Sequence, residues 1–282
     1  MKKKLFFGLA LGIGISLAVG FSWGLFQELA RRTVQDKLNQ NQHDLFAGSF
    51  QLGRLSLDPK LRVHLRKIQA ELQTPHGPVP LEIKEIETLN PFYDFLFKGG
   101  LLHFEDLKPL GSSYPGVQGT IRLQNGAKGF YEVEAKVLGW GLEELRWMDP
   151  VNLEGATGSI KGQVRLRQGI KGETALTGRF YVEQPGGKIA ARLFDVLLPY
   201  LPYLEKDEKI QQIRARGGAV GFRDASLLME MKDSGPMKFF VHVWVPDYNL
   251  NLNVDLKVRL DVKDAFLQLA DLLGALKENQ RP

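Results

Sequence analysis

Histidines, cysteines and paired carboxylates most often carry enzymatic or metal chemistry, and this chain spaces them poorly for either. Its five histidines are His43, His64, His76, His103 and His242, and no two of them lie within four residues of each other. A sequence-local metal or acid–base site brings such residues closer together, as in the HExxH zinc motif. The chain has no cysteine, so thiolate nucleophiles, disulfides and cysteine-bound zinc are excluded.

Neighbouring carboxylates occur at Glu143-Glu144 and at Glu132 and Glu134. We expect the first pair in a solvated turn and the second on the wet face of a strand, whereas catalytic carboxylates need a cleft that shifts their pKa. The sequence also has no glycine-rich phosphate loop after a strand and no nucleophile elbow. It therefore predicts a protein that is not an enzyme and that needs no cofactor or metal.

The net charge of +5 does not indicate a nucleic-acid partner. Lys2, Lys3 and Lys4 supply part of this charge, and the other basic residues are dispersed along the chain. A nucleic-acid binder usually shows a clustered basic stripe with interleaved aromatic residues. We therefore expect no binding to nucleic acid.

The N-terminus has the pattern of a membrane anchor. Leu5 to Phe26 is a run of 22 residues without charge, long enough to cross about 30 Å of hydrocarbon as a helix. The preceding lysines should stay in the cytoplasm, which places the rest of the chain on the far side of the membrane. A cleaved signal peptide is the alternative, because Ala18 and Gly20 form a small-residue cleavage pattern. Sparse apolar positions from Glu28 to Gln42 then predict a helical stalk.

Residues 250–262 alternate strictly between apolar and polar side chains. Since side chains point to opposite faces along a strand, this segment has one wholly apolar and one wholly wet face. Thirteen residues at about 3.3 Å each span roughly 43 Å, an apolar track long enough to take an acyl chain lengthwise.

Weaker alternation recurs along most of the chain and predicts about twelve strands joined by short turns, typical of an antiparallel sheet. A one-residue phase shift between Leu65 and Ile68 suggests a β-bulge. Short helices are expected at 92–97, 190–204 and 265–276, and residues 142–148 are expected to form a short helix or a turn. The predicted strands cover residues 50–57, 61–72, 79–83, 102–107, 117–123, 131–137, 159–167, 173–183, 188–189, 219–232, 237–245 and 250–262.

The pattern divides the chain into an anchor at 1–27, a helical stalk at 28–47 and two β regions at 48–150 and 151–282. The expected fold is mainly β: an N-terminal transmembrane helix followed by a long antiparallel sheet with a few short helices. One face of that sheet is apolar and must be covered, because large exposed apolar patches are rare in soluble monomers. A second sheet, the short helices or lipid acyl chains would each serve as the cover.

The order of these segments resembles the AsmA-like proteins of Gram-negative envelopes, relatives of the bridge-like, chorein-type lipid transfer proteins. The rhythm Leu-x-Gly-x-x-Gly-x-Ile-x-Gly at 153–162 is similar to that family's C-terminal region. The other segments that carry the resemblance are Lys2–Phe26, Gly48–Leu57, Leu61–Leu72, Asn90–Gly100 with the following 102–105, Val151–Ile189, the helical insert near 190–204 and the final strand from Leu250. The resemblance implies a curled sheet with an apolar groove and gives 151–282 the character of an AsmA-like β region.

We therefore expect a single-pass protein of the bacterial inner membrane, with a cytoplasmic N-terminus and most of the chain in the periplasm. Its expected role is to bind or pass phospholipid acyl chains along the groove and so to support envelope lipid homeostasis. Its partners would be membrane phospholipids and, beyond them, other envelope proteins. The residues expected to bind lipid are Leu250, Leu252, Val254, Leu256, Val258 and Leu260, with Val133, Val137, Val241 and Val243 expected as their neighbours in the groove.

The alternative is a non-enzymatic scaffold component of a secretion or outer-membrane assembly machine. In that case the β core is closed by protein, and the edge strands or the 265–276 helix bind other proteins. A charge placed at Val254 or Leu256 separates the two hypotheses, because it enters either a core or a groove.

Overall fold

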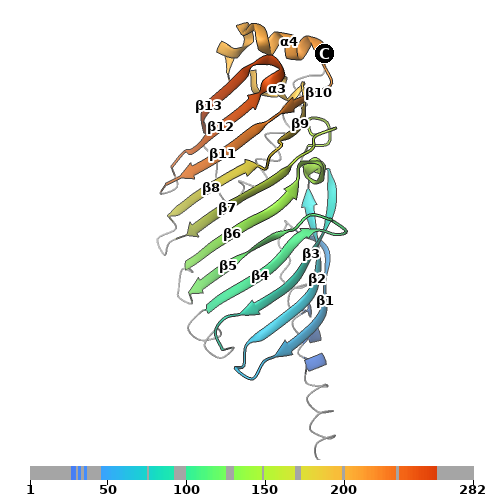
Figure 1. Ribbon diagram of the computed structural model, residues 1–282. Helices are drawn as coiled ribbons and strands as arrows, with labels where there is room; N and C mark the ends of the chain where they lie inside the picture. The colour runs from blue at the N-terminus through green and yellow to red at the C-terminus, as the bar shows by residue number, and fades with distance from the viewer. Residues whose placement is uncertain are drawn as a thin grey trace, which may run out of the picture.

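The computed structural model of the chain describes residues 27–29, 31–32, 35–36, 46–74, 76–91, 100–124, 130–147, 149–168, 173–198, 201–232 and 235–258. Within this part, one antiparallel sheet of eleven strands dominates, and its strands follow chain order from β1 to β8 and then β11 to β13. Figure 1 shows them stacked as a long twisted ribbon. The strands are β1 (Phe46–Leu57), β2 (Val63–Thr74), β3 (Gly77–Thr88), β4 (Gly100–Pro109), β5 (Val117–Gln124), β6 (Phe130–Gly141), β7 (Ser159–Gln168), β8 (Thr174–Val182), β11 (Asp224–Met231), β12 (Met237–Val245) and β13 (Leu250–Val258).

From β1 to β8 and from β11 to β13, each strand pairs with the strand before it in the chain, and β11 pairs with β8. β6 pairs with β7, so the sheet runs without interruption from the first β region into the second. Among the described strands, β1 and β13 are its two edges, so the sheet is open. The mainly β fold and the long antiparallel sheet predicted from the alternation are confirmed.

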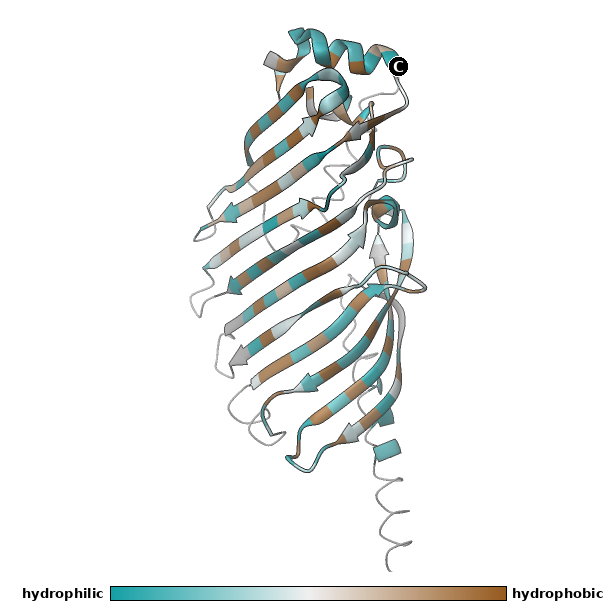
Figure 2. Ribbon diagram, in the orientation of Figure 1, coloured by the Kyte–Doolittle hydropathy of each residue, from teal (hydrophilic) through white to brown (hydrophobic). Residues whose placement is uncertain are grey.

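Figure 2 shows the physical basis of the sheet: apolar and polar residues alternate along most strands. In β13 the alternation is matched by burial, because Leu250, Leu252 and Val254 are buried while Asn251 and Asn253 are exposed. Registered pairs keep this phase from strand to strand, for example Val241 opposite Val254. The sheet therefore has one apolar face and one polar face along its whole width.

The phase shift between Leu65 and Ile68 is real, but it is not a β-bulge. A bulge places two residues of one strand opposite one residue of its neighbour, whereas the pairing of β2 with β3 keeps one register on both sides of Lys67. Lys67 has a positive φ of 55°. β3 shifts its apolar phase at the same level, between Ile83 and Ile86, so both strands turn together and no residue is left over.

A small cap of helices and a second, two-stranded sheet covers the C-terminal end of the large sheet (Figure 1). It contains β9 (Gly187–Ala190), α3 (Leu193–Leu197), η3 (Pro202–Lys206), α4 (Glu208–Arg216) and β10 (Ala219–Phe222). The Asp207 side chain caps α4 by accepting hydrogen bonds from the backbone N–H groups of Lys209 and Ile210. Gly217, with φ of 64°, ends the helix in a conformation that favours glycine.

In the described part of the chain, two short 3₁₀ helices also lie outside the cap. η1 (Leu142–Trp147) follows β6, as the sequence predicts, and η4 (Pro246–Tyr248) joins β12 to β13. Asn249 closes that connection in the left-handed conformation, with φ of 45°. Residues 27–29, 31–32 and 35–36 are helical, and the Arg31 guanidinium donates to the carbonyl oxygen of Leu52 on β1.

The single strand predicted over 219–232 is wrong. The chain breaks at Arg223, so that β10 pairs with β9 in the small sheet and β11 pairs with β8 and β12 in the large one. Both pieces alternate, but the apolar residues change phase at the break, from Val220 and Phe222 in β10 to Ala225 and Leu227 in β11, and the prediction did not use this shift. The predicted helices at 92–97 and 265–276, the anchor and residues 259–262 of the last strand lie outside the described residues.

Candidate functional site: the apolar face of the sheet

The apolar face is built from rows of side chains that cross the strands at right angles. Two rows run through all eleven strands without a gap in the pairing. In the described strands, no Asp, Glu, Lys or Arg stands on this face. One row is Leu52, Ile68, Ile83, Leu107, Val117, Val137, Gly162, Phe180, Leu227, Val241 and Val254, and the next is Leu55, Leu65, Ile86, Phe104, Gly119, Ala135, Val164, Gly178, Met229, Phe239 and Leu256.

In the middle of this face, phenyl rings lie next to glycines of the two rows. A Cβ atom at Gly119 would lie 2.9 Å from Cζ of Phe104, and one at Gly162 would lie 2.7 Å from Cδ1 of Phe180. The two phenyl rings thus occupy the space that side chains at the glycines would fill. The centre of the face is smooth and apolar as a result.

Over most of the apolar face, the side chains pack only against neighbours in the same sheet. Three of its four clusters of buried apolar side chains, centred on Ile68, Phe104 and Met231, contain side chains of the large sheet alone. In a two-layer domain, such clusters would include side chains from a second layer. Within the described residues, the apolar face from β1 to β8 therefore has the character of a single layer.

The fourth cluster is different, because the cap contributes to it. Ile210 and Ile213 of α4, both with no exposed surface, share this cluster with Val245, Leu250 and Leu252 of the large sheet. Phe194 of α3 and Phe222 of β10 join them. At the β12–β13 end, protein side chains therefore cover the dry face.

The structure places nine of the ten residues predicted for the lipid groove on this one face, and Leu260 lies outside the described residues. Val241 and Val243 lie directly opposite Val254 and Leu252, as predicted for neighbours. Val133 and Val137 are not neighbours of β13. They lie on β6, and β7, β8, β11 and β12 intervene because the chain meanders back and forth between them.

The nine residues also differ in what covers them. Leu250, Leu252 and Val254 are buried members of the cap cluster, against which Val241, Val243 and Leu256 pack. Val137 belongs to the cluster that only the sheet forms, and Val133 is partly buried beside it. Sequence reasoning overlooked the row positions on β1 to β5, such as Ile83 and Val117, although their alternation was visible.

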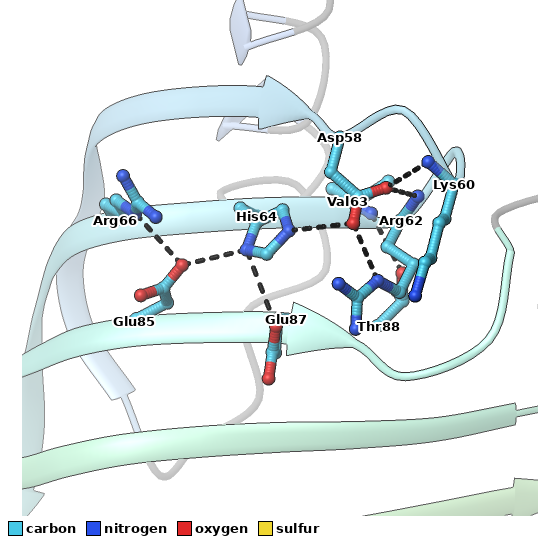
Figure 3. Close-up of polar contacts among 9 residues, drawn as sticks. All are labelled: Asp58, Lys60, Arg62, Val63, His64, Arg66, Glu85, Glu87 and Thr88. Carbon is cyan, nitrogen blue, oxygen red and sulfur yellow. Dashed lines mark hydrogen bonds and ion pairs between the residues drawn. The ribbon is translucent and has the colours of Figure 1, made fainter.

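The polar face carries paired charges, and the densest group lies at the β1–β2 turn (Figure 3). The Asp58 carboxylate accepts hydrogen bonds from the backbone N–H groups of Lys60 and Arg62, at 2.8 and 2.9 Å, and from Nε of Arg62 at 2.7 Å. His64 Nδ1 lies 2.8 Å from Oε1 of Glu85, to which Arg66 Nε also donates at 2.9 Å. These contacts fasten the turn and β2 to β3.

The same contacts shift two carboxyl groups. The backbone N–H of Arg62, helped by its guanidinium and by the N–H of Lys60, lowers the pKa of Asp58 to about 2. Partial burial acts to raise the pKa of Glu85, but hydrogen bonds from Arg66 and His64 outweigh it and leave that pKa below its usual value. Both groups are therefore charged and partnered at neutral pH, as expected for a structural network.

The described residues contain no group of histidines and carboxylates placed to hold a metal ion. No helix in the described part of the chain is long and apolar enough to cross a membrane. Comparisons of the chain with models of protein families, with curated proteins and with solved structures find no match. The candidate site thus rests on the geometry of the sheet alone.

Proposed function

We propose that the protein binds lipid acyl chains on the apolar face of its large sheet. The observation that carries the proposal is an uncharged face, running through eleven paired strands, whose clusters from β1 to β8 contain only the sheet's own side chains. Covering apolar surface stabilises a protein by about 25 cal/mol per Å² relative to leaving that surface in water. Acyl chains would supply that cover without directional contacts.

The dimensions of the face suit this ligand. The eight strands from β1 to β8, about 4.8 Å apart, give a width of roughly 34 Å across the strands. A bilayer's hydrocarbon core is about 30 Å thick, so each leaflet contributes chains of about half that length. The face is therefore long enough for acyl chains laid end to end along a row.

The cap directs the proposal to one part of the face. Leu250, Leu252 and Val254 already pack against protein, so the acyl chains would lie over β1 to β8. Ile121 of β5 and Val133 of β6 are central there, directly opposite each other and partly buried. They are the residues on which a test should concentrate.

The setting of this activity is part of the proposal. The charge-free run from Leu5 to Phe26 supports an inner-membrane anchor, with the sheet in the periplasm beside a source of phospholipid. The resemblance to AsmA-like proteins supports a role in moving phospholipid or in maintaining the outer membrane. The partners would then be phospholipids and other envelope proteins.

Site-specific photocrosslinking in bacteria tests the proposal on the full chain. A benzophenone amino acid replaces Ile121 or Val133 on the apolar face, and Thr120 on the polar face serves as the matched control. After irradiation, mass spectrometry of the purified protein identifies the adducts. We expect phospholipid adducts at 121 and 133 and none at 120.

The result that overturns the proposal is equally specific. Protein adducts at 121 and 133, with no lipid, would show that another protein covers the face and would support the scaffold hypothesis. Equal lipid labelling at 120 and 121 would also contradict it, because contact would then not depend on the face.

A further inference from the structure

The polar face has one feature that the lipid proposal does not use, a group of exposed apolar side chains. Tyr181 on β8, Leu228 on β11 and Phe240 on β12 are 47%, 37% and 38% exposed. The four other large apolar side chains that are exposed in the described part of the chain all lie outside the strands. The three on the sheet thus form a patch on a surface that is otherwise polar.

The patch is contiguous. Leu228 lies directly opposite Phe240 on one side and Arg179 on the other. Tyr181 follows Arg179 by two residues on β8, so it stands on the same face, diagonal to Leu228. Aromatic residues and arginine at the surface are typical of the centre of protein interfaces.

A hollow of about 780 Å³ adjoins the patch and crosses the strands from β4 to β11. Its side chains come from two adjacent rows of the polar face, one of them containing Lys136, Arg179 and Leu228. The floor of the hollow is formed by the residues between these two rows, among them Gly119 and Gly178, which have no side chain to cover the backbone. The hollow and the patch therefore share Leu228 and Arg179.

The charges along this row are not balanced. Arg165, on the other wall of the hollow, is paired with Glu132 at 2.9 Å and Glu134 at 3.2 Å. Lys136 and Arg179 are exposed and make no hydrogen bond or ion pair with another described residue. They stand two strands apart, about 9.6 Å at the backbone, so the uncompensated charge of this wall is positive.

We propose that this surface docks a partner protein through an extended segment in which an apolar side chain adjoins acidic residues. The apolar side chain would pack on Leu228 and Phe240, and the acidic residues would pair with Arg179 and Lys136. From β6 to β12 the row spans four strand spacings, about 19 Å, which about six extended residues cover. The segment would lie across the strands, along the hollow.

An anionic membrane surface fits this site less well than a peptide does. Glu134 and Glu230 line the hollow, and Asp255 lies directly opposite Phe240. Glu134 and Glu230 are paired with Arg165 and Lys232, but the Asp255 carboxylate would repel a sheet of anionic headgroups, whereas a single segment can pass beside it. The site is on the face opposite the proposed lipid surface, so the two proposals stand or fall separately.

Fluorescence anisotropy with labelled decapeptides tests the proposal on the full chain in mild detergent. Three peptide sets share one phenylalanine and one leucine and differ only in carrying four glutamates, four glutamines or four lysines. We expect the glutamate set to bind at least tenfold more tightly than the other two. Arg179→Glu and Phe240→Ser should each weaken that binding at least tenfold.

Matched variants control for general charge and surface effects. Arg54→Glu changes an exposed arginine of the polar face on β1, and Leu110→Ser removes an exposed leucine from a turn. Both should leave binding unchanged, and circular dichroism should show every variant folded, since all the changed side chains are exposed.

Three results would overturn the proposal. The first is equal binding of the glutamate and lysine peptides, and the second is a loss of binding in Arg54→Glu as large as that in Arg179→Glu. Binding to phosphatidylglycerol vesicles that depends on Arg179 and Phe240, without peptide binding, would assign the surface to a membrane instead.

Discussion

The two ends of the apolar face share one sequence pattern and differ in what covers it. Over β12 and β13, α3, α4 and β10 close the face, and Val245 has no exposed surface. Over β3 to β6, the face packs only on itself, and Ile83, Ile121 and Val133 are partly buried. Alternation therefore identifies a dry face, but it does not reveal whether protein or another molecule keeps that face dry.

The difference has an energetic consequence. Side chains of the cap cluster, such as Val245 and Ile213, have no exposed surface, so truncating them leaves a cavity and a polar replacement is buried. Ile121 on β5 and Val133 on β6 are only partly buried, so the same change there can be partly solvated. Equivalent substitutions at the two ends should therefore separate structural roles from binding roles.

The largest expected effect is that of Val254→Asp, at the capped end. Val254 is 4% exposed and packs in the cap cluster, so an aspartate there buries an unpaired charge. We expect a loss of several kcal/mol, enough to unfold this end or the whole domain. Limited proteolysis and urea unfolding measure it.

Asn253→Asp is the matched control for that substitution, because Asn253 is the exposed neighbour on the opposite face of β13. It should change the unfolding midpoint little. A soluble, stable Val254→Asp protein would contradict the closed end and would return β13 to the candidate lipid surface.

The next effect compares two truncations of isoleucine. Ile213→Ala in α4 removes a side chain with no exposed surface and should cost about 2–4 kcal/mol. Ile121→Ala on the open face should cost about 1 kcal/mol or less, since the site is partly exposed and can readjust. Urea denaturation of both variants gives the comparison, and equal losses would show that the open face is as tightly covered as the capped one.

The sequence alone predicted much of this architecture, because local alternation carries it. The antiparallel meander, the turn at Asp58 and the short helices between 190 and 204 were all visible in periodicity and in proline and glycine positions. The change of sheet at Arg223 and the cover over Val254 were not, because both depend on contacts between distant segments. The polar hollow was missed for the same reason, since its lining residues come from six strands.

A smaller effect concerns Gly162, which lies beside the ring of Phe180 in the middle of the open face. An added Cβ at Gly162 would lie 2.4 Å from the carbonyl oxygen of Arg179, a backbone atom that cannot move away alone. We expect Gly162→Ala to destabilise the protein by about 1–3 kcal/mol through overpacking. Thermal unfolding by circular dichroism measures the change.

Gly221→Ala in β10 is its control, because a Cβ there meets nothing within 4 Å. That variant should be neutral or slightly stabilising, since alanine restricts the unfolded chain more than glycine does. If Gly162→Ala is also neutral, the phenyl ring of Phe180 does not lie against the sheet as described, and the open face is looser than proposed.

The smallest predicted effect depends on pH and concerns the polar network at the β1 end. The pKa of Asp58 is lowered from 3.8 to about 2 in the folded protein, so its charge stabilises the fold above pH 3.8 and that contribution disappears as pH falls through about 2. Asp58→Asn keeps a hydrogen-bond acceptor and removes the charge. It should lower the urea midpoint at pH 7, and the difference from the wild type should shrink steadily below pH 3.8.

Because Asp58 fastens only the β1–β2 turn, amide hydrogen exchange should accelerate in β1 to β3 and stay unchanged in β12 and β13. A pH-independent difference would show that the contact works through hydrogen-bond geometry alone, and faster exchange in β13 would show that the open and capped ends unfold as one unit.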